Sequence, residues 1–169
     1  RLEDMIIRIA ALTGDADVNI DKRAVLVLSA DNGVLAQGVA QTPGEITAVM
    51  TGFISRGRSA VGCMAKAAGA DVITVDMGMF TRIEEDGLID RRIADGTNDM
   101  SQGPAMSRQQ AVQAIQTGID LVRGCKEKGY GIIATGEMGI GNTTTSSAVA
   151  SVLLGCPEIG RASGRERVK

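Results

Sequence analysis

Three short apolar runs, each followed by a glycine-bearing cluster, set the hydrophobic pattern of this chain. The runs cover residues 24–29, 71–76 and 131–135, and their unbroken apolar character predicts strands buried on both faces. The clusters that follow them are Asp31-Asn32-Gly33, Met77-Gly78 and Gly136-Glu137-Met138-Gly139. Such clusters are typical of turns, so each strand is expected to end in a loop.

Apolar residues at helical spacing fill the gaps between these runs. They predict helices over residues 2–12, 43–55, 59–68, 108–128 and 143–154. Ser107 and Gln110 form a capping box at the start of the fourth helix. Alternating strands and helices predict an α/β domain of three layers, with a mostly parallel, Rossmann-like sheet and helices on both faces. Ligands of such sheets collect at the carboxyl ends of the strands.

Both ends of the chain look unusual. It begins at Arg1 inside a helical pattern, and residues 161–169 form a basic stretch unlike anything before it. We therefore expect a partial α/β domain over residues 1–160 that is incomplete on its C-terminal side, followed by a tail from cloning or read-through. Because a truncated parallel sheet exposes an edge and apolar helix faces, we expect association with a second copy.

Composition narrows the possible chemistry. The chain has no histidine, which removes histidine-based acid–base catalysis and the commonest metal ligand. Its three cysteines are widely spaced, so a disulfide framework and a zinc site are both disfavoured and a reducing cytoplasm is expected. A net charge of −2 with intermixed signs gives no footprint for nucleic acid, and no apolar run is long enough to predict a membrane span.

The segment Gly-Glu-Met-Gly-Ile-Gly-Asn-Thr-Thr at residues 136–144 is the most informative motif. It leads from a strand into a helix, whose first amides are unpaired and carry partial positive charge. These amides predict a site for a phosphate or carboxylate. A tight strand-to-helix turn with capping threonines, needing no ligand, explains the same pattern, and the pattern alone does not separate the two.

Other polar groups at strand ends have two interpretations each. Glu137 is suited to accept a hydrogen bond from a ribose hydroxyl or a ring N–H, or to act as a base, but a solvated loop glutamate is the alternative. Asp31 and Asn32 are suited to bind hydroxyls, to orient a neighbouring loop, or to form an Asx turn. Four methionines suit either a ring pocket or the core, namely Met50, Met79, Met106 and Met138. The mixed-charge residues 84–92 predict a solvated excursion without a function.

Taken together, five segments resemble the ordered signatures of nicotinate-nucleotide–dimethylbenzimidazole phosphoribosyltransferase. They are residues 30–39 with the following Thr42-Pro43 and residues 45–48, then residues 75–78, 96–98, 103–107 and 136–144. The resemblance covers residues 1–160. Many members of that family read Asp-His-Gly where this chain has Asp31-Asn32-Gly33, so no role that requires an imidazole is carried over.

The resemblance implies a reaction and a set of substrate contacts. The 5-phosphoribosyl group of nicotinate mononucleotide passes to 5,6-dimethylbenzimidazole, giving α-ribazole 5′-phosphate and nicotinate, with inversion at the anomeric carbon and no cofactor. By matched position, Thr42 and Met50 flank the benzimidazole, Asp31 and Asn32 shape the pocket floor, Met138 contacts the ring and Glu137 approaches the base or ribose. The implied contacts on the ribose phosphate side are Gly139, Gly141, Asn142 and Thr143.

The family's general base is a glutamate in a C-terminal glycine-rich loop, which has no counterpart in these residues. We therefore expect no catalytic residue in this chain and little or no turnover by the chain alone. The resemblance also implies a homodimer. Two alternatives remain at this stage: a dinucleotide-dependent oxidoreductase, which requires a glycine fingerprint directly after the first strand, and a non-catalytic module that binds a nucleotide or azole.

Overall fold

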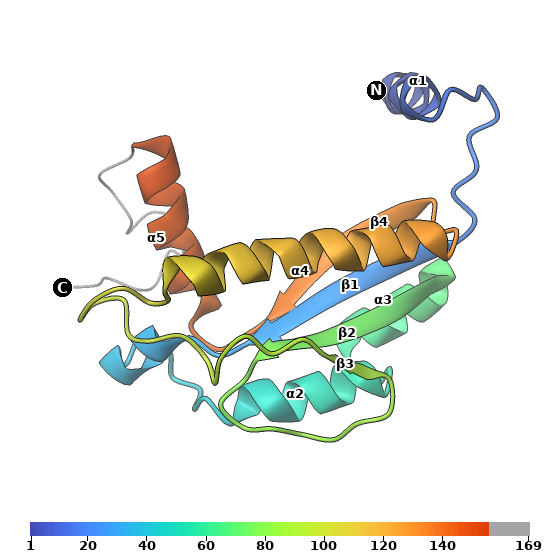
Figure 1. Ribbon diagram of the computed structural model, residues 1–169. Helices are drawn as coiled ribbons and strands as arrows, with labels where there is room; N and C mark the ends of the chain where they lie inside the picture. The colour runs from blue at the N-terminus through green and yellow to red at the C-terminus, as the bar shows by residue number, and fades with distance from the viewer. Residues whose placement is uncertain (156–169) are drawn as a thin grey trace.

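The fold is a parallel sheet with helices on both faces, as a computed structural model that describes residues 1–155 shows (Figure 1). The four strands are β1 (Arg23–Ala30), β2 (Ala70–Gly78), β3 (Leu88–Asp90) and β4 (Ile132–Met138), in the order β3-β2-β1-β4. All the paired strands are parallel. The predicted fold class is therefore confirmed, while the expected boundary at residue 160 and the tail at 161–169 lie outside the described residues.

The helices follow the predicted pattern closely. They are α1 (Leu2–Thr13), α2 (Ile46–Ser55), α3 (Ala60–Ala68), α4 (Arg108–Glu127) and α5 (Asn142–Leu154), with a short 3-10 turn η1 (Gly33–Gln37). The capping box of α4 is formed: the Gln110 N–H donates to Ser107 Oγ (3.2 Å) and the Ser107 N–H to Gln110 Oε1 (2.8 Å). Figure 1 shows α4 crossing one face of the sheet while α2 and α3 lie on the other, as right-handed crossovers require when β1→β2 and β3→β4 run in opposite directions across the sheet.

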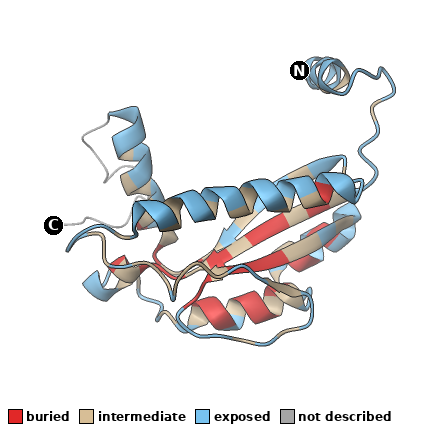
Figure 2. Ribbon diagram, in the orientation of Figure 1, coloured by how far each residue is buried: buried red, intermediate tan, exposed pale blue. Residues whose placement is uncertain are grey.

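The core lies between β1, β2 and the α2–α3 layer. Leu26, Val75 and Met79 are at most 2% exposed, and Figure 2 places most of the buried residues in these elements. By contrast, none of the residues of α1 is buried, and only Cys125 is buried on α4. The predicted apolar face of α4 is thus correct as a helix pattern, but Val112 and Ile115 on it remain more than half exposed among the described residues.

The prediction for the third strand needs two corrections. The third predicted strand is not buried on both faces: β4 has no buried residue, because it lies at the end of the described sheet and α5 turns away from it. It also runs on to Met138, so Gly136, Glu137 and Met138 are strand residues and the loop proper is residues 139–141. Hydrogen-bonded pairing with β1 explains the extension, since Leu28 and Ser29 face Glu137 and Met138.

The mixed-charge segment is not a simple solvated excursion. Residues 88–90 form β3, whose Leu88 pairs with Thr74 of β2. Two residues later the Arg92 side chain is 7% exposed. A strand of three residues carries too little alternation to be predicted from sequence, and a buried arginine cannot be told from an exposed one by its neighbours in the chain.

Candidate substrate-binding site

The carboxyl ends of β1, β2 and β4 bring the predicted site residues to one edge of the sheet. Ala30 of β1 pairs with Gly78 of β2, and Ser29 pairs with Met138 of β4. Because the strands are parallel, the residues that follow each of them emerge side by side. The site is therefore built from the segments after Ala30, Gly78 and Met138.

Asp31 connects these segments to one another by hydrogen bonds rather than facing a ligand. Its side chain is buried, and Oδ2 accepts a hydrogen bond from the Phe80 N–H at 2.7 Å. Its backbone N–H donates to the Gly78 carbonyl at 3.0 Å, and its carbonyl accepts from the Thr97 N–H at 3.1 Å. Asp31 lines none of the three cavities described below, so any contribution it makes to a pocket floor is exerted through the loops it holds.

Asn32 links the end of β1 to the loop after β4. Its Nδ2 donates to the Ile140 carbonyl at 3.3 Å, and its Oδ1 accepts from the Thr145 hydroxyl at 2.9 Å. Of the roles open from sequence, orientation of a neighbouring loop is the one the structure shows. Asn32 also lines a cavity, so it remains a candidate for ligand contact.

The glycine bend, residues 139–141, is shaped by its own packing. Gly139 is buried, and a Cβ there would lie 2.2 Å from the Ala30 carbonyl oxygen. Gly141 has φ +87, in the left-handed region that glycine adopts without strain. Close approach to the end of β1 and the turn into α5 therefore account for both glycines.

The amides of this bend are largely committed to internal partners. The Ile140 N–H donates to Thr47 Oγ1 at 3.1 Å, and the Asn142 N–H donates to the Gly139 carbonyl at 3.1 Å. The prediction that the bend's amides spread toward a phosphate is wrong for these two groups. Thr143, which is exposed in the first turn of α5, stays a predicted phosphate contact.

The remaining predicted residues take three different positions. Glu137 is exposed, and its carboxylate accepts a short hydrogen bond from Asn142 Nδ2, so these two predicted contacts are brought together. Met138 ends β4 and Met50 lies on α2; both are partly buried, and neither lines a described cavity. Their predicted contacts with an aromatic ring stay predictions.

A cavity of ≈ 490 Å³ opens beside the end of β1, and we call it the Phe80 cavity. It joins Asn32 and Thr42, two residues predicted from sequence, with Phe80, which was not predicted. Further lining comes mainly from small and apolar residues, namely Leu35, Ala36, Ala40 and Pro43. Phe80 lies just outside the resembled segment at residues 75–78, and the available signals were this proximity and the scarcity of aromatic residues in the chain.

A second cavity of ≈ 350 Å³ lies between the strand ends and the start of α4. Its lining includes Gly96, Thr97 and Asn98 of one resembled signature and Met106 of the next. These loops are bonded to the end of β1, because the Gly33 N–H donates to Thr97 Oγ1 at 3.0 Å. The signature segments thus form one connected edge, although they are far apart in the sequence.

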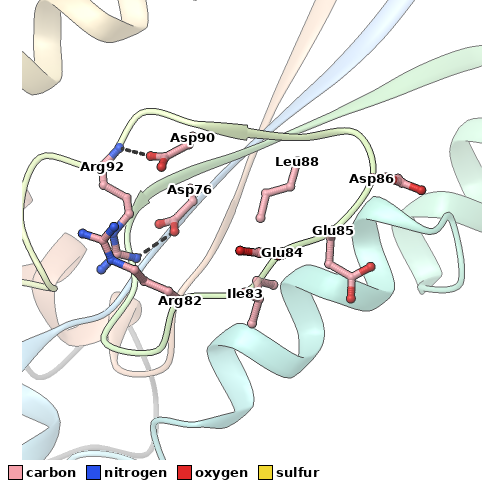
Figure 3. A pocket seen from close by; sticks show the side chains of 9 residues that line it. All are labelled: Asp76, Arg82, Ile83, Glu84, Glu85, Asp86, Leu88, Asp90 and Arg92. Carbon is pink, nitrogen blue, oxygen red and sulfur yellow. Dashed lines mark hydrogen bonds and ion pairs between the residues drawn. The ribbon is translucent and has the colours of Figure 1, made fainter.

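The largest of these three cavities, of ≈ 650 Å³, lies beside β3, and none of the predicted site residues lines it (Figure 3). Its walls are mostly charged, and Arg92 pairs within it with Asp76 at 2.8 Å, both side chains being at most 7% exposed. Burial opposes the charge of Arg92, but hydrogen bonds to Asp76 and Asp95 outweigh it and raise the pKa of the guanidinium. The same contact lowers the pKa of Asp95. This cavity is organised by an internal ion pair.

No group of three or more Cys, Asp or Glu side chains among residues 1–155 is placed to hold a metal ion. No helix of this part of the chain combines the length and apolar character needed to cross a membrane.

A parallel α/β sheet with loops converging at its carboxyl edge is the architecture of an enzyme domain that binds its ligand at that edge. A family model described as phosphoribosyltransferase matches residues 1–165. The chain belongs to this phosphoribosyltransferase family, which confirms the resemblance found from sequence.

The curated relatives agree in name. The chain is 42% identical over 153 residues to the nicotinate-nucleotide–dimethylbenzimidazole phosphoribosyltransferase of Acetivibrio thermocellus, covering 90% of this chain and 44% of that protein. It is 41% identical to the protein of the same name from Ruminiclostridium cellulolyticum, covering 98% and 47%. The chain thus spans about half the length of the curated relatives it matches.

Solved structures show the same fold. The crystal structure of CobT from Thermus thermophilus superposes with a TM-score of 0.88 at 38% identity, over 92% of this chain and 47% of that one. At this identity the likeness extends to sequence as well as to architecture.

Proposed function

We propose that this chain serves the transfer of the 5-phosphoribosyl group from nicotinate mononucleotide to 5,6-dimethylbenzimidazole, giving α-ribazole 5′-phosphate. The observation that carries the proposal is the connection between signature segments at one edge of the sheet. Asp31 is bonded to Gly78 and Thr97, and Asn32 is bonded to Ile140. The names and identities of the relatives supply the particular substrates.

The Phe80 cavity is assigned to the benzimidazole. Its apolar walls suit a flat, weakly polar ring, while Thr42 and Asn32 offer hydrogen-bonding groups that fix the ring's orientation. The leaving pyridinium is already a good leaving group and the ribosyl carbon becomes cation-like. Catalysis then depends on holding the acceptor ring close to that carbon and on removing its N–H proton. The general base is proposed to lie outside these 169 residues.

The ribose and phosphate are assigned to the surface beside the Phe80 cavity. Glu137 is exposed, and its carboxylate is held by Asn142, so it is oriented to accept a hydrogen bond from a ribose hydroxyl. Since the amides of Ile140 and Asn142 are already engaged, the phosphate is assigned to Thr143 at the electropositive start of α5.

Ligand titrations of the purified chain test this function. Saturation-transfer NMR should show binding of 5,6-dimethylbenzimidazole, and chromatography of a mixture with nicotinate mononucleotide should show little or no release of nicotinate. No binding of the azole would overturn the proposal. Binding of NAD(P) in place of the azole would favour the oxidoreductase alternative. If a longer protein that contains this chain binds the azole but shows no turnover, the alternative of a non-catalytic binding module would be favoured.

Assembly and location form a separate part of the proposal. The exposed apolar residues of α4, among them Val112 and Ile115, support a homodimer. Sedimentation of the purified chain at several concentrations checks this, and a monomer throughout would contradict it. A cytoplasmic location is proposed from the sparse, widely spaced cysteines.

A further inference from the structure

Phe80 is an aromatic residue in an uncommon setting. It is 48% exposed in a chain that contains only two phenylalanines, one tyrosine and no tryptophan. Phe80 lines the Phe80 cavity together with Thr42 and Pro43. An exposed phenylalanine gains less from burial than one in the core, so the contribution of this ring to folding is limited.

The backbone that carries Phe80 is fixed by buried charged groups on three sides. Asp76 Oδ1 accepts from the N–H groups of Gly78 (2.8 Å) and Met79 (3.0 Å). Asp31 Oδ2 accepts from the Phe80 N–H (2.7 Å), and Arg92 Nη2 donates to the Met79 carbonyl (2.6 Å). Hydrogen bonds to charged groups are among the stronger ones in proteins. Residues 78–80 are therefore held rigidly although Phe80 itself is at the surface.

The ring of Phe80 rests directly on Gly96. A Cβ at position 96 would lie 2.3 Å from Phe80 Cε1 and 2.8 Å from Cδ1, a distance that real Cβ atoms do not adopt. Gly96 also has φ +73, where other residues are strained. The absence of a side chain at 96 thus sets how far the ring is withdrawn from the cavity.

We propose that Phe80 is a specificity-determining residue that contacts the face of the acceptor heterocycle, with Asp31 and Gly96 as positioning residues. This role of Phe80 rests on the proposed function and adds to it the residue that selects the acceptor heterocycle by its size. A rigidly mounted aromatic face loses little side-chain freedom when a flat ring packs on it. Leu35 and Pro43 add apolar lining to this open cavity, and Thr42 and Asn32 supply polar groups for a ring nitrogen. This chemistry fits a bicyclic azole.

Binding of 5,6-dimethylbenzimidazole to Phe80→Leu tests the contact. Loss of aromatic stacking should weaken binding by about tenfold and should abolish most of the upfield ring-current shift of the bound ligand's protons. Phe53→Leu, an aromatic substitution on α2 away from the three cavities, is the matched control and should change neither quantity. Equal affinity and equal ring-current shift in wild type and Phe80→Leu would overturn the inference while leaving the proposed function intact.

The positioning role of Gly96 is tested by comparing two acceptor rings of different size. In Gly96→Ala the new methyl group pushes the Phe80 ring toward the cavity, so 5,6-dimethylbenzimidazole should lose about tenfold in affinity relative to unsubstituted benzimidazole. In the double variant Gly96→Ala/Phe80→Leu that preference should disappear, because the smaller side chain restores the space. An unchanged preference in the folded single variant would contradict the role of Gly96.

The Asp31→Asn variant tests the positioning role of the Asp31 carboxylate. A carboxamide oxygen is a weaker acceptor, so the Phe80 N–H is held less firmly. The ring-current shift per bound ligand should fall, whereas a purely structural role would leave this shift unaltered in the folded fraction. If Asp31→Asn does not fold, the ring-size comparison above decides the positioning claim on its own. If the wild-type chain binds no azole at all, both the inference and the proposed function fail.

Discussion

The two sides of the site are held in place by different means. On the β2 side, residues 78–80 are fixed by the buried side chains of Asp31, Asp76 and Arg92. On the β4 side, the glycine bend is held by two neutral side chains, Thr47 and Asn32. Buried hydrogen bonds to charged groups are strong, and removing one partner costs much free energy of unfolding because a charge is left buried and unpaired. Neutral hydrogen bonds contribute less, and removing one partner costs less.

The largest expected effect comes from breaking the Arg92–Asp76 ion pair on the β2 side. Arg92→Met leaves Asp76 buried without its cation, and we expect a loss of about 3–5 kcal/mol in the free energy of unfolding. Urea denaturation followed by circular dichroism measures it. The matched control is Arg123→Met, which breaks an exposed pair with Asp120 on α4 and should cost less than about 1 kcal/mol. Equal losses in the two variants would contradict the contrast.

A smaller effect is expected on the neutral side. Thr47→Val removes the acceptor of the Ile140 N–H and should cost about 1–3 kcal/mol, with faster hydrogen exchange at Ile140. Thr51→Val is the control on the same helix, because Thr51 is equally buried but its hydroxyl only bonds back to the Thr47 carbonyl at 2.8 Å. Unchanged exchange at Ile140 in Thr47→Val would show that the bend does not depend on this contact.

The smallest effect concerns the opposite edge of the sheet, where Tyr130 donates to Asp71 at 2.7 Å just before β4. This hydrogen bond, with some burial and the nearby negative charge, raises the pKa of Tyr130 to about 12. Because the folded pKa is raised, the stability from this contact is present below about pH 10 and is lost as the pH rises through about 12.

Since Tyr130 is the only tyrosine, phenolate absorbance in the near ultraviolet reports it alone. The midpoint should move down toward the ordinary value of about 10 in Asp71→Asn. A midpoint near the ordinary value in the wild-type chain would show that the contact is not formed in solution.

The pattern of apolar residues was sufficient to predict β1, β2 and the five helices, because their periodicity is local. It failed where a partner distant in sequence decides the outcome. The Ile140 N–H looked available for a phosphate, but Thr47, 93 positions away, accepts it. Arg92 looked solvated, but Asp76 draws it into a buried pair. Phe80 drew no functional prediction, because only the fold brings it to the same cavity as Thr42.

The side chain of Asn32 has a consequence for how this site responds to acidity. Asn32 donates a hydrogen bond to the Ile140 carbonyl and accepts one from the Thr145 hydroxyl, so a residue that replaces these contacts needs both a donor and an acceptor. A neutral imidazole has one donor and one acceptor nitrogen, but it becomes a double donor when protonated. A carboxamide keeps both capacities throughout. In this chain the hydrogen bonds that connect β1 to α5 through Asn32 therefore do not depend on pH over the range in which a histidine would titrate.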